Sequence, residues 1–252
     1  MPGLMLALFA AQAASALSLA EQGRLTQCLD AARRDPPSAI ATANEWLGES
    51  SGAARALPQQ CLGQAYVSLL RWEAAEEAFL AARDAATDRA WRARLGAMAG
   101  NAALAAERWD AALAILDAAI GDAAMAGETA LAGSISADRA LALVGLDRLE
   151  AAGAALEQAR ADAPQNPEGW LLSATLARRQ DDLSGAASFI AVAAALAPDD
   201  PRIALEAGTI AILANDEEAA RRNWQRVRNL APDSAEATVA AGYLAQLDGS
   251  GE

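Results

Sequence analysis

Side chains that perform covalent chemistry are scarce in this chain of 252 residues. The sequence contains no histidine and no lysine, which removes serine–histidine and serine–lysine nucleophiles, histidine-bound zinc and Schiff-base formation. Pairs of carboxylates such as Glu217 and Glu218 occur where we expect the first turns of helices, a position that the helix dipole favours for acidic residues. We therefore predict that the chain is not an enzyme and has no cofactor and no metal ion.

The two cysteines, Cys28 and Cys61, lie 33 positions apart and lack the paired spacing of a metal site. In an exported protein an even pair of cysteines is most simply a disulfide. A bond closing that loop would stabilise the fold by about 3–4 kcal/mol. The alternative is that both are buried thiols that pack as small apolar residues.

The chain begins with an apolar run from Leu4 to Ala16 that ends in small residues typical of a signal-peptide cleavage site. Residues 1–16 are therefore predicted to be a signal peptide, although Met1–Gly3 lack the basic residue that usually precedes the apolar run. Cleavage would place the protein in the periplasm or outside the cell, with no integral membrane segment in the mature chain. The alternative is a cytoplasmic protein whose first helix is rich in alanine.

The net charge of −13 argues against nucleic-acid binding, which depends on clustered cations that neutralise phosphates. Hydrophobic residues make up 54% of the chain but aromatic residues only 4%, with alanine supplying much of the difference. Alanine favours helices and adds little volume, so this composition predicts slender helices packed closely together.

An alanine–proline step recurs at a fixed interval, at Ala163-Pro164, Ala197-Pro198 and Ala231-Pro232. The intervals are 198 − 164 = 34 and 232 − 198 = 34 residues. A constant period of this length is typical of stacked repeats, in which each unit buries its apolar face only against its neighbours.

Several units carry small, bulky and proline residues at corresponding positions. In 56–89 these residues are Leu62, Gly63, Tyr66, Ala75, Phe79 and Ala82. In 167–200 they are Trp170, Ala186, Ala193 and Pro198, and in 201–234 they are Gly208, Ala220, Trp224 and Pro232. This pattern resembles the tetratricopeptide repeat, a helix–turn–helix motif. The resemblance implies an all-α, right-handed superhelical solenoid that binds protein segments without catalysis.

Counting outward from these matches predicts a solenoid over residues 17–247. Its units are expected at about 20–53, 56–89, 93–126, 133–166, 167–200 and 201–234, with short insertions such as 127–132 between the earlier ones. Residues 235–247 are expected to form a C-terminal capping helix, followed by a flexible tail at 248–252.

In this family the first helices of the units line a concave groove that usually holds an extended or helical peptide. Repeat position gives ten candidate groove residues, which are Gln60, Gln64, Arg94, Asn101, Asp138, Thr175, Arg178, Arg202, Thr209 and Tyr243. Trp46 and Trp91 fall outside the motif positions and are candidate exposed anchors.

A second candidate surface is the basic patch Arg221, Arg222, Arg226 and Arg228. In an acidic protein these arginines could bind an acidic partner. The alternative is a solvated face on which they pair with Glu217 and Glu218 of the same helix.

These features together predict an interaction scaffold of the cell envelope that binds a protein or peptide in its groove, with self-association as a further mode of binding. Two alternatives remain open: an accessory subunit that positions an envelope enzyme or assembly complex, and a cytoplasmic adaptor if the N-terminus is not cleaved.

Overall fold

A computed structural model describes residues 18–249, so the predicted signal peptide lies outside the described residues. The described chain consists of thirteen α-helices and one short 3-10 helix (Gly52–Arg55), and it contains no strand. The α-helices are α1 (Leu19–Arg34), α2 (Pro36–Glu49), α3 (Ala56–Ser68), α4 (Trp72–Ala85), α5 (Arg89–Ala105), α6 (Trp109–Ala126), α7 (Thr129–Gly145), α8 (Leu149–Asp162), α9 (Pro167–Arg179), α10 (Leu183–Leu196), α11 (Pro201–Leu213), α12 (Glu217–Leu230) and α13 (Ala235–Gly249). None of these helices is both long and apolar enough to span a membrane.

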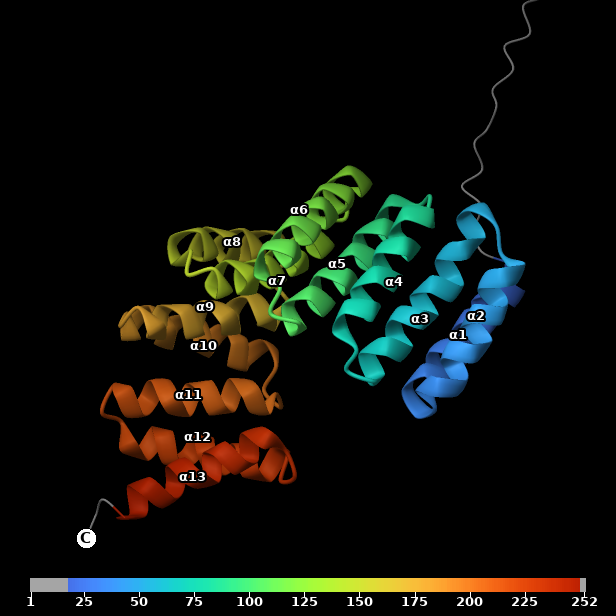
Figure 1. Ribbon diagram of the computed structural model, residues 1–252. Coiled ribbons are helices and arrows are strands. Elements are labelled where there is room, and N and C mark those ends of the chain that lie inside the picture. Colours follow the sequence, from blue (N-terminus) through green and yellow to red (C-terminus); the bar gives the residue numbers. More distant parts are fainter. Residues whose placement is uncertain (1–17, 250–252) are drawn as a thin grey trace, which may run out of the picture.

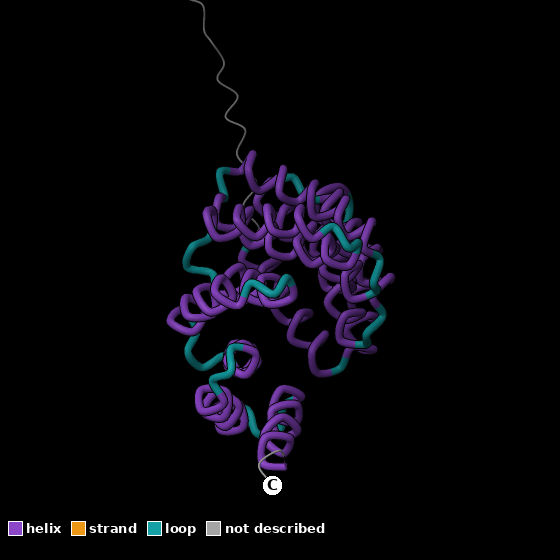
Figure 2. The backbone as a smooth tube through the Cα atoms, turned by 90° about the vertical axis from the view of Figure 1, so that its left-hand side faces the viewer, coloured by secondary structure: helices purple, strands orange, loops and turns teal. Residues whose placement is uncertain are grey.

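The helices form consecutive antiparallel pairs that follow one another along a curved path from α1 to α13 (Figure 1). Figure 2 shows the same array from the side, with short loops joining the helices. From α2 onward each helix packs mainly on the helix before and after it in the sequence, as in a solenoid, whereas α1 packs on both α2 and α3. This architecture confirms the all-α repeat fold expected from the sequence.

The odd-numbered helices lie on the inner side of the curve. From α5 to α13 each odd-numbered helix also contacts the next odd-numbered helix, whereas the even-numbered helices make no comparable contacts with one another. Helices crowd together on the inside of a bend and separate on its outside. The first helix of each pair therefore supplies the inner face.

Small residues let the paired helices approach closely. A Cβ atom added to Gly63 would lie 2.5 Å from the ring of Phe79, and one added to Gly208 would lie 2.4 Å from Nε1 of Trp224. Phe79 and Trp224 are both buried, so each glycine leaves the space that a bulky side chain of the partner helix fills. The alanine–proline steps end helices, because α8, α10 and α12 stop one residue before Ala163, Ala197 and Ala231.

Two expectations about irregular segments were wrong. The segment 127–132 is not an insertion between units, because α7 starts at Thr129 and the extra residues lengthen the helices. Only Gly127 and Glu128 form the connection, with Gly127 in the left-handed region (φ 74°), which glycine adopts without strain. Asp248 and Gly249 belong to α13 rather than to a flexible tail.

A disulfide joins Cys28 of α1 to Cys61 of α3, with the two Cα atoms 5.9 Å apart. Both cysteines are buried in one apolar cluster with Trp46 and Leu57. The bond therefore connects the first two helix pairs through their shared core.

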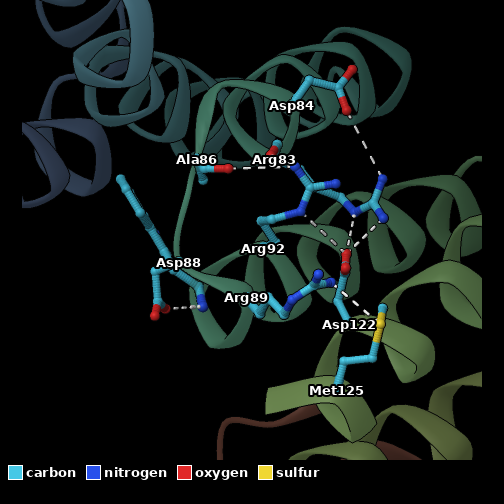
Figure 3. Close-up of polar contacts among 9 residues, drawn as sticks. Arg83, Asp84, Ala86, Asp88, Arg89, Arg92, Asp122 and Met125 are labelled. Atoms are coloured by element: carbon cyan, nitrogen blue, oxygen red, sulfur yellow. Dashed lines mark hydrogen bonds and ion pairs between the residues drawn. The ribbon is translucent and has the colours of Figure 1, made fainter. Parts of the chain in front are cut away.

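A buried ion cluster holds the middle of the array together (Figure 3). The guanidinium groups of Arg83 on α4 and Arg92 on α5 both approach Oδ2 of Asp122 on α6, at 2.6 Å and 3.6 Å. Arg92 also donates to the backbone carbonyl of Arg83. The side chain of Asp122 is only 6% exposed, so its charge is compensated almost entirely by the two arginines.

The turns inside the helix pairs contain one unusual residue, Leu70. Five turn residues adopt positive φ angles, and the other four are the polar residues Glu107, Asp147, Asp181 and Asn215. Leu70 has φ 56° and is 69% exposed, so no packing offsets the cost of the left-handed conformation.

We expect Leu70→Asn to stabilise the protein by about 0.5–1 kcal/mol, because asparagine tolerates this conformation better and no buried contact is lost. Thermal denaturation would measure the change. The reverse substitution at the equivalent turn, Asn215→Leu, should destabilise by a similar amount. A less stable Leu70→Asn variant would contradict the assignment of strain to this turn.

Candidate partner-binding surface

Three of the predicted groove residues lie together on the inner face. Asn101 of α5 donates a hydrogen bond from Nδ2 to Oδ2 of Asp138 on α7, over 3.1 Å. Gln64 of α3 and Asn101 line the same hollow. The inner face therefore carries a continuous polar row from α3 to α7.

The hollow between α3 and α5 has a volume of about 230 Å³. Besides Gln64 and Asn101, it is lined by Val67, Trp72, Phe79, Met98 and Ala102. The ring of Trp72 is half-buried and forms part of this lining. Two carboxamides beside apolar walls can bind a peptide main chain and an apolar side chain at the same point.

Asp138 supplies the carboxylate of this polar row. Its pKa is raised to about 6, mainly by burial and to a smaller extent by the nearby Glu168 carboxylate, while the hydrogen bond from Asn101 acts in the opposite direction. No arginine forms an ion pair with Asp138 within residues 18–249. The inner face thus presents a carboxylate whose ionisation is unfavourable in the folded chain.

Asp138→Asn should stabilise the protein at neutral pH and have little effect at acidic pH. Between pH 3.8 and about 6 the folded chain binds more protons than the unfolded chain, so wild-type stability falls as pH rises through this range. At about 1.4 kcal/mol per pH unit, the penalty reaches on the order of 2–3 kcal/mol above pH 7. Urea unfolding at pH 4 and pH 7.5 would measure it. A difference between variant and wild type that does not grow with pH would contradict the burial of this carboxylate.

The three predicted groove arginines are held by acidic partners. Arg178 makes two hydrogen bonds to Glu206, of 2.7 Å and 3.2 Å. Arg202 pairs with Asp200 at 2.7 Å and with Glu168 at 3.0 Å. The hydrogen bond to Asp200 is the main reason that the pKa of Arg202 lies above its usual value.

The pair between Arg94 and Glu128 is longer, at 3.6 Å, and more than two-fifths of each side chain is exposed. A ligand carboxylate would have to displace these acids, so the three arginines are poor first contacts for an anion.

The other four predicted groove residues already make contacts within the chain, three of them through their polar groups. Gln60 accepts a hydrogen bond from Nε1 of Trp91. The hydroxyl groups of Thr175 and Thr209 donate to carbonyls one turn earlier in their own helices. Tyr243 packs against Trp224 with the ring centroids 4.9 Å apart.

Neither tryptophan proposed as an exposed anchor stands free. Trp46 is buried, with 5% of its surface exposed, and the guanidinium of Arg24 lies 4.6 Å from its ring centroid. The prediction of an exposed anchor at Trp46 was therefore wrong, because the sequence did not reveal that α1 and α3 enclose it. Trp91 is half-buried and is held by Gln60.

The predicted basic patch lies on the exposed side of α12, opposite the buried Ala220, Trp224 and Val227. Arg221 pairs with Glu217 at 3.4 Å and with Asp248 of α13 at 2.5 Å, and Arg222 pairs with Glu218. Arg226 donates to the backbone carbonyl of Pro198 over 2.7 Å. The pairing within the helix that the sequence offered as an alternative thus accounts for two of the four arginines.

Sequence reasoning missed two apolar and two acidic residues that complete the inner face. Val67 and Met98 line the hollow, and Glu168 and Glu206 hold the arginines. Each occurs on a first helix, so repeat position could have indicated them. No cluster of three or more acidic or cysteine side chains suited to a metal ion occurs among the residues described by the structure.

Consecutive helix pairs of this length, stacked with small-to-bulky contacts and an inner face of first helices, define the tetratricopeptide-repeat fold. No protein-family model matches the chain, and no curated protein matches it. The comparison with solved structures therefore carries the assignment of the fold.

PilW, described as a widely conserved type IV pilus biogenesis factor, superposes with a TM-score of 0.70 and 17% identity, covering 89% of this chain and 100% of PilW. PilF of Pseudomonas aeruginosa has a TM-score of 0.66 and 16% identity, covering 90% of this chain and 97% of PilF. BtubC from P. vanneervenii has a TM-score of 0.62 and 16% identity, with coverages of 82% and 90%. With identities this low, the superpositions show a shared fold and no more than that.

Proposed function

We propose that this chain is a non-catalytic scaffold that binds a segment of a partner protein along its inner face. The observation that carries the proposal is the hollow between α3 and α5, where Gln64 and Asn101 flank apolar walls and Asn101 continues to Asp138. The hollow suits an apolar side chain, and the two carboxamides suit the peptide groups beside it. The absence of histidine and lysine from the sequence supports a passive role.

Asp138 gives the bound segment a further expected property. Its carboxylate is half-buried and lacks an arginine partner within the described chain, and a buried charge gains most when a cation pairs with it. A segment with a basic residue close to its apolar anchor would supply that cation. The preferred ligand is therefore an apolar residue followed or preceded by arginine or lysine.

Binding at the hollow predicts a specific loss of partner capture. Gln64→Ala with Asn101→Ala should release the partner in a pull-down from the source cells, because both carboxamide contacts disappear. Asn44→Ala with Gln158→Ala is the matched control, since it removes one asparagine and one glutamine from the exposed surfaces of α2 and α8. An unchanged partner list for the inner-face variant, or an equal loss for the control, would overturn the proposal.

We further propose that the scaffold acts outside the cytoplasm, in the cell envelope. The disulfide between Cys28 and Cys61 is typical of oxidising compartments, and the apolar residues 4–16 are typical of a signal peptide. The likeness in fold to a type IV pilus biogenesis factor favours the variant of this role in which the chain is an accessory part of an envelope assembly complex. The cytoplasmic adaptor remains the alternative. N-terminal sequencing of protein from fractionated cells decides between them: an intact N-terminus in the cytoplasmic fraction would contradict export.

A further inference from the structure

A second surface, remote from the hollow between α3 and α5, lies between α12 and α13 at the C-terminal end of the array (Figure 1). Two adjacent hollows open there, with volumes of about 520 Å³ and 400 Å³. Both are lined by Gln225, Arg228 and Asn229, so they form one continuous trough along α12. We call this surface the C-terminal trough.

The trough is cationic on a chain that is strongly acidic. Its walls contain four arginines, Arg221, Arg222, Arg226 and Arg228, but only two acids, Glu218 and Asp248. The difference of 4 − 2 = +2 contrasts with the net charge of −13 for the whole chain. The clustering follows from the sequence of α12, which buries Ala220, Trp224 and Val227 and leaves its arginines on the opposite side.

Two of the arginines retain charge that the fold does not neutralise. The guanidinium of Arg226 donates to the carbonyl of Pro198, which carries no charge. Arg228 is exposed and forms no ion pair with any of residues 18–249. Guanidinium groups in this state bind carboxylates through charge-assisted hydrogen bonds, which are stronger than neutral ones.

The rest of the lining indicates a peptide rather than a simple anion. Gln225 and Asn229 each offer a donor and an acceptor, which matches the alternating groups of a peptide main chain. Leu244, Ala237 and Ala241 of α13 supply an apolar wall. A long nucleic acid suits the trough poorly, because it would extend beyond the local positive charge into the field of an acidic protein.

We propose that the C-terminal trough is a second docking site, which binds an acidic segment of a partner protein through Arg226 and Arg228. Carboxylates of the segment pair with these two guanidinium groups, and its main chain lies along Gln225 and Asn229. The scaffold then has two sites of different chemistry, an apolar and acidic one on the inner face and a cationic one at its C-terminal end. Such a chain can join two partners, or two segments of one partner, at fixed separation.

The test measures binding of a fluorescein-labelled polyglutamate peptide to the full chain by fluorescence anisotropy, with the matching polyglutamine peptide as reference. We expect saturable binding of polyglutamate that weakens as salt rises, and no binding of polyglutamine. Arg226→Gln with Arg228→Gln should weaken binding by about tenfold or more, since each lost charge-assisted contact has a large effect on affinity. Arg228→Gln alone should weaken it measurably without disturbing the contact to Pro198.

Arg33→Gln with Arg34→Gln on α1 is the control for net charge, because it removes the same two charges from an exposed site at the other end of the array. This control variant should change the affinity for polyglutamate by less than twofold, because charges outside a binding site have only small effects on affinity. Equal loss in both double variants, or none in either, would overturn the proposal. So would competition by inorganic phosphate as strong as by free polyglutamate, or tighter binding of single-stranded DNA.

Self-association is a separate outcome that would also overturn the assignment to a partner protein. If sedimentation velocity shows a dimer that Arg228→Gln dissociates, the occupant is a second copy of this chain. The inner-face variant Gln64→Ala with Asn101→Ala should bind polyglutamate like the wild type, so failure at the trough and failure of the proposed function are distinguishable.

Discussion

Asp122→Ala should be among the most damaging single substitutions in the chain, with an expected loss of about 3–5 kcal/mol of unfolding free energy. Removing the carboxylate leaves the guanidinium groups of Arg83 and Arg92 facing each other, with side chains only 17% and 27% exposed. Two partly buried like charges without a counter-ion are destabilising, and no nearby acid can replace Asp122 from the interior. Urea unfolding monitored by circular dichroism would measure the loss.

The matched control is Asp84→Ala, which removes an acid from the same arginine. Asp84 lies 3.9 Å from Arg83 and is 75% exposed, so its loss should change stability by less than about 0.5 kcal/mol. Replacing all three members together by apolar residues, with Arg83→Met, Arg92→Met and Asp122→Leu, should be far less harmful than Asp122→Ala alone. If the single and triple variants lose the same stability, packing rather than charge explains the cluster.

Removing the disulfide should cost about 3–4 kcal/mol, because the bond closes a loop with a sequence separation of 33. Cys28→Ala with Cys61→Ala is the preferred variant, since both sulfurs are buried and alanine introduces no polar group. In a solenoid each unit depends mainly on its neighbours, so the loss should be confined to the N-terminal units. Hydrogen exchange should show reduced protection of α1 and α2, with α9–α13 unchanged.

Reduction of the wild type provides an independent control for the disulfide. Dithiothreitol should lower wild-type stability to that of the double variant and should leave the variant unaffected. Uniform loss of protection along the whole chain would contradict a local effect of the disulfide. Unchanged stability of the wild type after reduction, with mass spectrometry showing that both cysteines are free, would contradict a stabilising role of the bond.

The repeat pattern predicted the fold because its signals are local. An alanine–proline step ends a helix wherever it occurs, since proline cannot donate the next backbone hydrogen bond. The contact between Gly208 and Trp224 was likewise visible as a small residue and a bulky residue at fixed positions of one unit. The structure of inserted residues was harder to predict from the sequence. The additional residues at 127–132 could form a loop or extend the helices, and packing against the neighbouring helix pair decides between these two outcomes.

The candidate site was predictable only in part, because its chemistry depends on pairing across units. Repeat position located Gln64, Asn101 and Asp138 on the inner helices, but it could not show that Arg178 is held by Glu206, 28 positions later. The same limit hid the cluster at Asp122, whose main partner Arg83 is 39 positions away. In alanine-rich helices the sequence gives little information about which side chains pair between units, because two helices can pack in several registers that bury alanine equally well.

Site-specific photocrosslinking in the source cells tests whether a partner segment binds along the inner face. A benzophenone side chain in place of Arg94 of α5, which is 54% exposed, would lie on the inner face. The same group in place of Gln158 of α8 would lie on the exposed surface of an outer helix. We expect a covalent adduct with one partner protein from position 94, lost when Gln64→Ala and Asn101→Ala are added, and none from position 158. Adducts from position 158 alone, or adducts from position 94 that persist in the double variant, would contradict the account.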